Sequence, residues 1–479
     1  MSLLKRMGQQ DIEETRYRPY INTGSPLDII NGKFISTVDG GWALSGGLGL
    51  TTAVIAEANR YKSTLLNGCA VNALARFPES DFMLMDSEFS QQKERIAHFS
   101  DLYLDNTEER AKHIAYLKDH ISIFDPTTSK AESLDAWFDY TKEIRDWKLQ
   151  HYKDYEVETE ILDTDTGKPY RMLLPTFMGV DSWTEAFVKQ INVRNEEFDA
   201  NTEMKDQRTM FLEEGWQKMR LMRELPSICA KGGIYFVLTG HLGEKQTIGN
   251  TPNKKDLAFM GQNETTKSMG SKFYFLMSSI FKIGNSELLR DKTDKTASEY
   301  PSESGVSFNE LQRLLITYVR GKNAGDGKQV QVVSSQNLGV LNGLSYYDFL
   351  RENKYWGLGA PNKVRNPLLG DLNLGRTKIF DASKEYKVKR ALELTYQLFV
   401  IQSYWSLSNQ PVNYGISIEE FFHKLQGSGY AIDDILNSRG WWTYKQKDAK
   451  GDFTRPFLTL PSILAMLDGS YKSKYILVK

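Results

Sequence analysis

Cysteine and histidine are scarce in this 479-residue sequence, which contains two cysteines, Cys69 and Cys229, and six histidines. Both cysteines stand in segments with helical character, so they do not provide the disulfide framework of a small secreted domain. No group of cysteines and histidines has the spacing of metal ligands, which argues against a zinc site. We therefore expect a reduced, intracellular protein.

A marked excess of charge and a long apolar run are also missing. The 60 Lys and Arg residues balance 61 Asp and Glu residues, giving a net charge of -1, so binding to nucleic acid would depend on local patches. The first residues, MSLLKRMGQQDIEE, lack the apolar core of a signal peptide. The most apolar late stretch, 391–407, contains Glu393, Gln397 and Gln402 and is too polar to span a bilayer. We expect a soluble cytoplasmic protein, in the host cell if the chain is phage-encoded.

An apolar run that closes on a Lys-Ser pair is present in residues 52–64, TAVIAEANRYKST. A strand that ends in a turn before a helix places Lys62, Ser63 and the first helical N–H groups around one point, where an anion is stabilised. The phosphate-binding loop G-x-x-x-x-G-K-[ST] works in this way, its Lys neutralising the terminal phosphates and its hydroxyl ligating magnesium. Here both glycines are replaced, and the alternative is that the pair merely begins a helix. The predicted nucleotide-binding residues are Ala56, Glu57, Ala58, Asn59, Arg60, Tyr61, Lys62, Ser63 and Thr64.

Two further segments have the pattern of core strands that end in acidic residues. Residues 81–88, DFMLMDSE, follow a predicted buried helix at 65–76, and residues 173–182, LLPTFMGVDS, come later. Ligands gather at the carboxyl edge of a parallel α/β sheet. We therefore expect Asp181 to hold Mg²⁺ through water together with Ser63, and Glu88 to polarise the water that attacks the γ-phosphate of ATP. The alternative is that Asp86, Glu88 and Asp181 only cap helices.

The segment AEANRYKS, followed by a strand ending MDSE, then GVDS and GIYFVLTGH, resembles the core of the RecA-type recombinases. It is most similar to their phage branch, typified by UvsX. In that branch an aromatic residue can replace the last glycine of the loop, as Tyr61 does here. The resemblance covers about residues 46–284 at the level of motifs. It implies an α/β fold with a RecA-like P-loop ATPase core, a mostly parallel twisted sheet, and a mainly helical C-terminal domain.

The same resemblance implies roles for individual residues. Glu88 matches the catalytic glutamate, acting with Lys62, and Asp181 matches the Walker B aspartate. His241 stands at the end of the next core strand, where a polar residue senses the γ-phosphate. A neutral imidazole drawn toward the nucleotide would move the loop attached to it, so that ATP and DNA would raise each other's affinity. The alternative for His241 is a buried, satisfied histidine.

A long lysine-bearing stretch with little periodicity, residues 242–272, follows His241. Loops of this length inside a compact domain are usually functional or disordered. By position the stretch resembles the second DNA-binding loop of the recombinases, and the alternative is a solvated surface loop. A mobile loop of this kind tracks a single-stranded backbone with its cations while an aromatic side chain stacks on the bases. The predicted DNA-binding residues are Lys245, Lys254, Lys255, Phe259, Lys267 and Lys272.

The length allows two or three domains. We divide the chain into an N-terminal arm and lead-in (1–45), an ATPase core (46–338) with an insertion around 91–172, and a C-terminal domain (339–479). The arm either packs on a neighbouring protomer, as in recombinases, or is a loosely ordered terminus. Predicted helices are 91–100, 106–119, 131–152, 182–192 and 209–231; predicted strands are 121–125, 233–241, 272–284 and two within 311–333; a hairpin is expected at 157–172 and an exposed loop at 285–307.

Basic residues on late strands of recombinases reach the γ-phosphate held by the next protomer, and Lys282, Arg320 and Lys328 are the candidates here. Near the C-terminus, Trp441, Trp442 and Tyr444 form either a duplex-contacting patch or, by preference, part of a core.

The function implied by the resemblance is that of an ATP-dependent DNA recombinase. It would use ATP and Mg²⁺, form head-to-tail filaments on single-stranded DNA, and promote homologous pairing and strand exchange with duplex DNA. One alternative is a hexameric ring helicase of the same superfamily. The other is a non-hydrolysing structural protein that coats single-stranded DNA, because the loop lacks both glycines.

Overall fold

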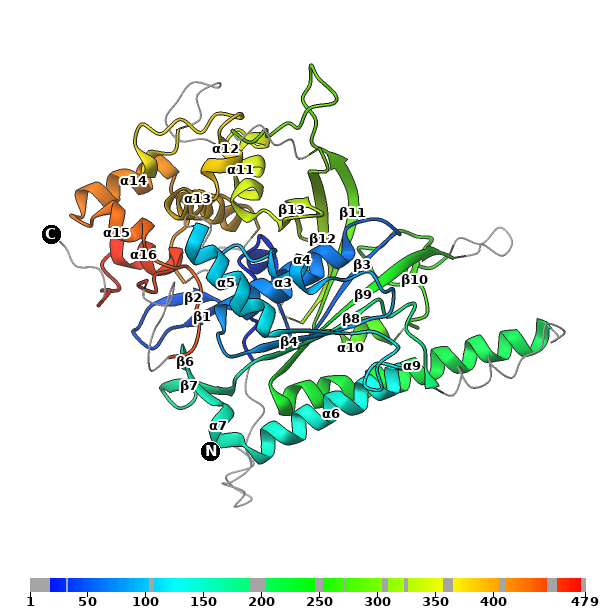
Figure 1. The fold of residues 1–479 in the computed structure, drawn as a ribbon. Helices are drawn as coiled ribbons and strands as arrows, with labels where there is room; N and C mark the ends of the chain where they lie inside the picture. The colour runs from blue at the N-terminus through cyan, green and yellow to red at the C-terminus, as the bar shows by residue number, and fades with distance from the viewer. Residues whose placement is uncertain are drawn as a thin grey trace.

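A ten-stranded sheet with helices on both faces forms the centre of the molecule in the computed structural model (Figure 1). The strand order is β14-β13-β12-β11-β3-β9-β8-β4-β5, with β10 paired to β9. The structure describes residues 18–31, 33–102, 107–189, 204–245, 253–270, 272–303, 309–322, 326–355, 365–404, 411–445 and 455–474.

The strands from β11 to β5 run parallel, and the sheet continues antiparallel from β11 through β12, β13 and β14. Every residue of β3 and β8 is buried, because a parallel strand covered on both faces has no solvent side. The expected α/β class is confirmed, and the mostly parallel central sheet is compatible with a RecA-like core. The bounds are β3 Thr51–Ala56, β4 Asp81–Asp86, β5 Ile121–Phe124, β8 Thr176–Asp181, β9 Ile234–Glu244, β10 Glu264–Thr266, β11 Ser279–Leu288, β12 Gln312–Gly321, β13 Gln329–Ser335 and β14 Gly339–Val340.

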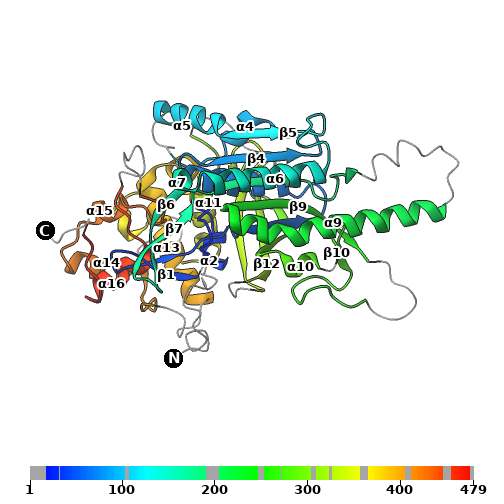
Figure 2. The same cartoon turned by 90° about the horizontal axis from the view of Figure 1, so that it is seen from below.

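Side chains alternate along β3 between two cores, one on each face of the sheet. Val54 and Ala56 belong to the core beneath α3 (Lys62–Arg76), α4 (Lys93–Ala97) and α5 (Thr107–Asp119). Ala53 and Ile55 belong to the core on the other face. That face is covered by α6 (Leu134–Gln150), α9 (Met204–Gly232) and α10 (Phe273–Leu276), and Figure 2 shows α6 and α9 side by side.

The insertion contains the elements that its periodicity predicts. After α6 come α7 (Tyr152–Tyr155) and a hairpin of β6 (Glu156–Asp163) and β7 (Lys168–Leu173). The predicted strands at 121–125 and 233–241 and the two within 311–333 are also confirmed, as β5, β9, β12 and β13.

The remaining helices pack around a further core that joins the two ends of the described chain. Ile29, Phe34 and Leu44 are buried in this core with residues of the late helices. The described part of the arm, 18–31 and 33–45, therefore packs within its own chain and is not a loosely ordered terminus, whereas its packing on a neighbouring protomer stays a prediction; residues 1–17 lie outside the described residues. The bounds are α2 Leu27–Asn31, β1 Phe34–Ser36, β2 Trp42–Leu44, α11 Asn342–Glu352, η1 Pro367–Leu369, α12 Ile379–Ala382, α13 Tyr386–Tyr404, α14 Ile418–Gly427, α15 Ile432–Leu436 and α16 Leu460–Leu467.

Three predicted elements differ from the structure. The helix predicted to follow Asp181 is a turn at residues 182–185 followed by an irregular segment at 186–188, because Trp183 is buried and its N–H bonds the Thr239 carbonyl of β9 at 3.0 Å. The remainder of that prediction, 190–192, lies outside the described residues. The strand predicted at 272–284 begins as α10, with Phe273, Tyr274 and Met277 buried, and only Ser279 starts the strand.

The third difference is the loop predicted at 285–307. Its first residues extend β11 to Leu288, and Leu289 and Tyr300 are buried.

For the aromatic residues near the C-terminus, the prediction that they belong to a core is confirmed. Trp441, Trp442 and Tyr444 are 7%, 0% and 7% exposed, so a duplex-contacting patch made of them is wrong.

Candidate functional site

The turn between β3 and α3 keeps the backbone conformation that glycine usually supplies. Asn59 and Tyr61 have φ of 57° and 56°, in the left-handed region that glycine adopts most readily. Two side chains of the turn tie it to β11 and to the turn before β12: Arg60 Nη1 donates to Ser286 Oγ at 2.8 Å, and Tyr61 Oη donates to the Glu310 carbonyl at 3.0 Å. These contacts hold residues that lack glycine's freedom in a glycine-like turn.

The amino end of α3 offers donors for an anion. The first N–H groups of a helix have no partner inside the helix, and within the described residues the side chain of Tyr61 does not cap them. Lys62 is 7% exposed, and its Nζ donates to the Glu57 carbonyl of the turn at 2.8 Å. Burial lowers the pKa of Lys62, while Glu88 and Asp181 act against that shift. The ammonium group of Lys62 thus lies at an amino end of a helix that has no side-chain cap.

Asp181 lies 1% exposed at the end of β8, held by neutral donors. Thr239 Oγ1 donates to its Oδ1 at 2.6 Å, and Gln91 Nε2 donates to its Oδ2 at 2.9 Å. Burial raises the pKa of Asp181 to about 6, although hydrogen bonds from Thr239 and Ser63 oppose the rise. The hydroxyl of Ser63 and the carboxylate of Asp181 therefore lie together, and hard oxygen ligands of this kind suit Mg²⁺.

Lys62, His241 and Glu88 form a chain of polar contacts across the site. Lys62 Nζ lies 3.3 Å from His241 Nδ1, and His241 Nε2 lies 3.6 Å from Glu88 Oε1. An ammonium group can only donate, so Nδ1 accepts and the ring proton resides on Nε2, facing Glu88. The hydrogen bond from His241 is the first cause of the lowered pKa of Glu88, which keeps this carboxylate ionised.

The carboxylate of Asp86 contacts backbone N–H groups, unlike the carboxylates of Glu88 and Asp181. Its carboxylate accepts from the backbone N–H of Glu88 at 3.1 Å and of Gln91 at 2.7 Å. It closes the turn after β4 and does not cap α4, whose N-cap residue is Gln92. Asp181 and Glu88 instead direct their carboxylates toward Ser63 and His241.

Gln91 and Thr239 escaped the sequence analysis. Thr239 stands two residues before His241 on β9, so period-two alternation places both on one side of the strand and was an available signal. Gln91 lies in the irregular segment before α4, where no pattern marks it. It bridges the site, because its Nε2 reaches Asp181 while its Oε1 accepts from Asn67 of α3 at 3.0 Å.

The described part of the lysine-bearing stretch is packed on the sheet. Met260 and Met269 are buried, and β10 pairs with the end of β9. Lys245 Nζ pairs with Asp256 Oδ1 at 2.6 Å, which leaves its charge neutralised. Phe259 is 46% exposed and touches Gly327. The other predicted DNA contacts lie exposed at the surface: Lys254, Lys255, Lys267 and Lys272. Residues 246–252 and 271 of the stretch lie outside the described residues.

The three basic residues predicted to reach the nucleotide of a neighbouring protomer differ in whether their charge is already paired. Lys282 Nζ donates to Glu264 Oε1 at 2.7 Å, so its charge is already paired. Arg320 has a longer ion pair, 3.8 Å to Asp326, and its guanidinium lies 5.9 Å from the exposed ring of Phe275. Lys328 is half-buried. Arg320 is therefore the candidate that the geometry favours.

A stripe of exposed side chains on α9 was not anticipated. Trp216 is 67% exposed, the largest value among large apolar side chains in the described residues. Arg220 and Arg223 are exposed too, and neither has an ion-pair partner within the described parts of the chain. The spacing i, i+4, i+7 places all three on one face of the helix, which reaches beyond the sheet in Figures 1 and 2.

The described residues contain neither a metal-ligand group nor a membrane-spanning helix. The part of the chain that the structure describes contains no group of three or more His, Cys, Asp and Glu side chains arranged for a metal ion. Every helix in the described ranges is too short or too polar to cross a membrane.

The predicted site residues converge although they come from distant parts of the chain. Lys62 and Ser63 follow β3, Glu88 follows β4, and Asp181 and His241 stand at or near the ends of β8 and β9. The register pairs Ala56 with His241 and Asp86 with Asp181. No family model matches the sequence, and a search of curated proteins finds none that matches. The functional interpretation therefore depends on geometry and motif.

Proposed function

We propose that this protein is an ATPase that uses Mg²⁺ and acts on single-stranded DNA, with the recombinase activity of filament formation, homologous pairing and strand exchange. The observation that carries the proposal is the meeting of Lys62, Ser63, Glu88, Asp181 and His241 at the carboxyl edge of the sheet. That edge is where ligands of parallel α/β sheets bind.

The residues of the site fit a magnesium nucleotide. The uncapped amino end of α3 and the ammonium of Lys62 supply donors for phosphate oxygens. Ser63 and Asp181 would hold Mg²⁺, directly or through water, and the ion would neutralise charge on the phosphates. The raised pKa of Asp181, about 6, marks a buried carboxylate that a cation would stabilise.

Hydrolysis requires a base for the attacking water, and Glu88 takes that role. Its lowered pKa keeps it ionised, so it accepts a proton as the water oxygen bonds to the γ-phosphorus. The bond from that phosphorus to the β,γ-bridging oxygen breaks, and ADP and phosphate leave. The contact of Lys62 with His241 and with the Glu57 carbonyl would yield to phosphate oxygens.

His241 offers a link between nucleotide and DNA. Its Nε2 proton faces Glu88 and would turn to a γ-phosphate oxygen. Beyond His241, β9 runs on to Glu244 and pairs with β10, and the Lys267 N–H bonds the His241 carbonyl at 2.9 Å. A shift of the histidine would therefore move the lysine-bearing segment directly.

The stripe on α9 supports a single-stranded nucleic acid as partner. An exposed tryptophan provides a stacking platform for bases, and unpaired arginines bind phosphates. Trp216, Arg220 and Arg223 combine both properties on one helix face. The stripe supplies the local basic patch that a chain with net charge -1 needs.

ATP turnover by the full chain, with and without single-stranded DNA, tests the proposal. We expect turnover to rise with DNA. Replacing Lys62 with Ala should weaken nucleotide binding by about 1.5 to 3 kcal/mol, because a charge-assisted contact is lost; unchanged affinity measured by calorimetry contradicts the site. Turnover that is absent in the wild type supports the structural coat protein instead.

Electron microscopy with ATP and DNA separates the remaining candidates. Long helical filaments support the recombinase, and closed hexamers support the helicase. For the α9 stripe, replacing Arg220 and Arg223 with Gln should weaken DNA binding and flatten its salt dependence by about 0.7 per lost phosphate contact. Replacing the exposed Trp147 of α6 is the control and should leave DNA binding unchanged.

A further inference from the structure

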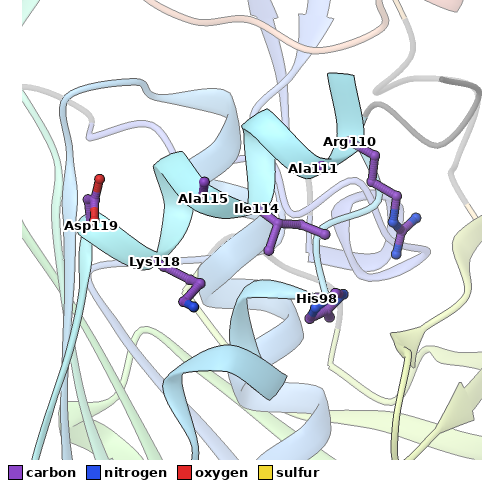
Figure 3. A pocket seen from close by; sticks show the side chains of 7 residues that line it. All are labelled: His98, Arg110, Ala111, Ile114, Ala115, Lys118 and Asp119. Carbon is purple, nitrogen blue, oxygen red and sulfur yellow. The ribbon is translucent and has the colours of Figure 1, made fainter. Parts of the chain in front are cut away.

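A groove of about 600 Å³ lies along α5, with His98, which follows α4, as the lining residue from outside α5 (Figure 3). None of its lining residues belongs to the nucleotide site or to the α9 stripe. Figure 3 shows Arg110 and His98 at one end, Lys118 and Asp119 at the other, and Ile114 between them. The lining residues are His98, Arg110, Ala111, Ile114, Ala115, Lys118 and Asp119.

One end of the groove carries Arg110, a cation with no ion-pair partner among the described residues. Arg110 is half-buried, and burial is the sole cause of its lowered pKa. Within the described residues no carboxylate pairs with it. The pKa of His98 is lowered by burial and then by Arg110 and Lys118, so the cations of the groove are Arg110 and Lys118, and the imidazole of His98 beside Arg110 favours its neutral form. A partly buried cation that lacks a partner is destabilising until an anion approaches it.

The other end carries a cation that is free to exchange partners. Lys118 Nζ lies 3.2 Å from Glu94 Oε1, but the two side chains are 37% and 67% exposed. Exposed ion pairs of this kind contribute little. Lys118 therefore remains available to a ligand that approaches along α5.

The middle of the groove is apolar and follows the helix axis. Arg110, Ile114 and Lys118 are spaced i, i+4, i+8 and share one stripe of α5, with the two cations separated by about 12 Å along the axis. Ala111 and Ala115 beside them are exposed. Small side chains at this spacing let another backbone approach closely.

We propose that this groove docks an acidic amphipathic helix of a partner protein. Two acidic side chains, about two turns apart, would face Arg110 and Lys118, and apolar residues between them would cover Ile114 and the two alanines. A helix matches the length and the spacing of the cations, which a compact anion does not. Single-stranded DNA fits less well, because the lining has no aromatic platform and Asp119 lies at the rim. The proposal is independent of ATP hydrolysis.

Binding of a labelled synthetic helix to the full-length protein tests the proposal by fluorescence anisotropy. The probe carries two glutamates two turns apart with leucines between them, and a matched peptide carries lysines in place of the glutamates. The wild type should bind the acidic probe, and Arg110→Glu should weaken that binding at least about fivefold while improving binding of the lysine peptide. Lys112→Glu, at an exposed position outside the groove, is the control and should bind like the wild type.

Circular dichroism and ATP turnover accompany each variant, because Arg110 has no place in the proposed site and its replacement should change neither. Equal affinity of the wild type and Arg110→Glu for the acidic probe overturns the proposal. So does Arg110-dependent binding of an anilinonaphthalene sulfonate or of oligo-dT when the acidic helix does not bind. Failure of the wild type to hydrolyse ATP would contradict the proposed function and leave this result untouched.

Discussion

Two buried aspartates near opposite ends of α3 have opposite electrostatic properties. Asp181, beside Ser63 at the amino end, is 1% exposed, and burial raises its pKa to about 6. Asp101, beside Arg76 at the carboxyl end, is 6% exposed. Burial also raises the pKa of Asp101, but Arg76 and Lys389 outweigh that effect and hold it well below the usual range.

The difference lies in the neighbours. Arg76 Nη1 donates to Asp101 Oδ1 at 3.2 Å, Lys389 Nζ donates to its backbone carbonyl at 2.7 Å, and Asn342 Nδ2 donates to its Oδ2 at 2.8 Å. This compensated cluster ties the core helix α3 to α11 and α13. The hydrogen bonds to the Asp181 carboxylate come from neutral donors, Thr239 and Gln91. A buried carboxylate held by cations serves the fold, whereas one left without full compensation has the capacity to bind a cation.

The largest effect is expected from breaking the compensated cluster. Asp101→Asn removes the charge that Arg76 and Lys389 require, so the free energy of unfolding should fall by about 3 to 5 kcal/mol. Urea unfolding followed by circular dichroism measures it. Glu57→Gln, at a side chain 70% exposed, is the control and should change stability by less than about 0.5 kcal/mol. Equal effects of the two substitutions would contradict the assignment of Asp101 to the fold.

The second-largest effect is expected at the proposed nucleotide site, at the amino end of α3. Glu88→Gln keeps the shape of the side chain and removes the base, so ATP turnover should fall by a factor of about 100 or more. Nucleotide affinity and unfolding free energy should stay near wild type, because Glu88 is 36% exposed. Steady-state turnover together with equilibrium binding makes the distinction. Turnover that survives the substitution assigns the base to another residue.

The raised pKa of Asp181 makes a prediction about pH. Its folded-state pKa of about 6 lies above that of an unfolded aspartate, so its stabilising contribution is present at low pH. That contribution is lost as the pH rises from about 4 through about 6, a loss on the order of 1 to 3 kcal/mol. Urea unfolding as a function of pH, with a chelator present, measures this loss of stability.

Asp181→Asn should remove this pH dependence, and magnesium with a nucleotide analogue should restore stability above about pH 6 by binding the ionised carboxylate. If the free energy of unfolding of wild type and of Asp181→Asn depends on pH in the same way, the pKa of Asp181 is not raised, and its contrast with Asp101 is lost.

The smallest effect tests the glycine-like turn. Asn59→Gly should stabilise the protein slightly, by at most about 1 kcal/mol, because Asn59 has φ of 57° and glycine adopts this conformation without strain. Ala58→Gly, next to it without a positive φ, is the matched control and should be neutral or destabilising. Thermal unfolding of both variants measures the difference. Equal shifts for the two would mean that strain is not stored at Asn59.

Local patterns were sufficient for most of the sheet and for its layer helices. The apolar runs at β3, β8 and β9 and the period of α5 and α6 predict elements that the structure contains. The failures occur where apolar residues serve tertiary contacts instead of a repeating face. The pattern at Trp183 and its neighbours predicts a helix, but this segment bonds to β9. The pattern at Phe273–Leu276 predicts a strand, but these residues form α10.

For the candidate site too, local patterns predict some of the residues, and tertiary contacts place the others. Lys62 and Ser63 follow from a motif, and the acids at strand ends follow from the rule for parallel sheets. Gln91, its bridge to Asn67, and the contact of His241 with both Lys62 and Glu88 depend on distances between segments far apart in the chain. The exposed stripe on α9 could be found only after α9 had been placed.

The sequence by itself determined which residues can carry charge, donate a proton or end a strand, because these are properties of side chains and of local periodicity. Tertiary structure decided which charges are compensated. Asp101 and Asp181 are the same residue type in similarly buried places, yet only packing brings Arg76 and Lys389 to one and neutral donors to the other. Electrostatic energy depends on distance and burial, and both are fixed by the fold.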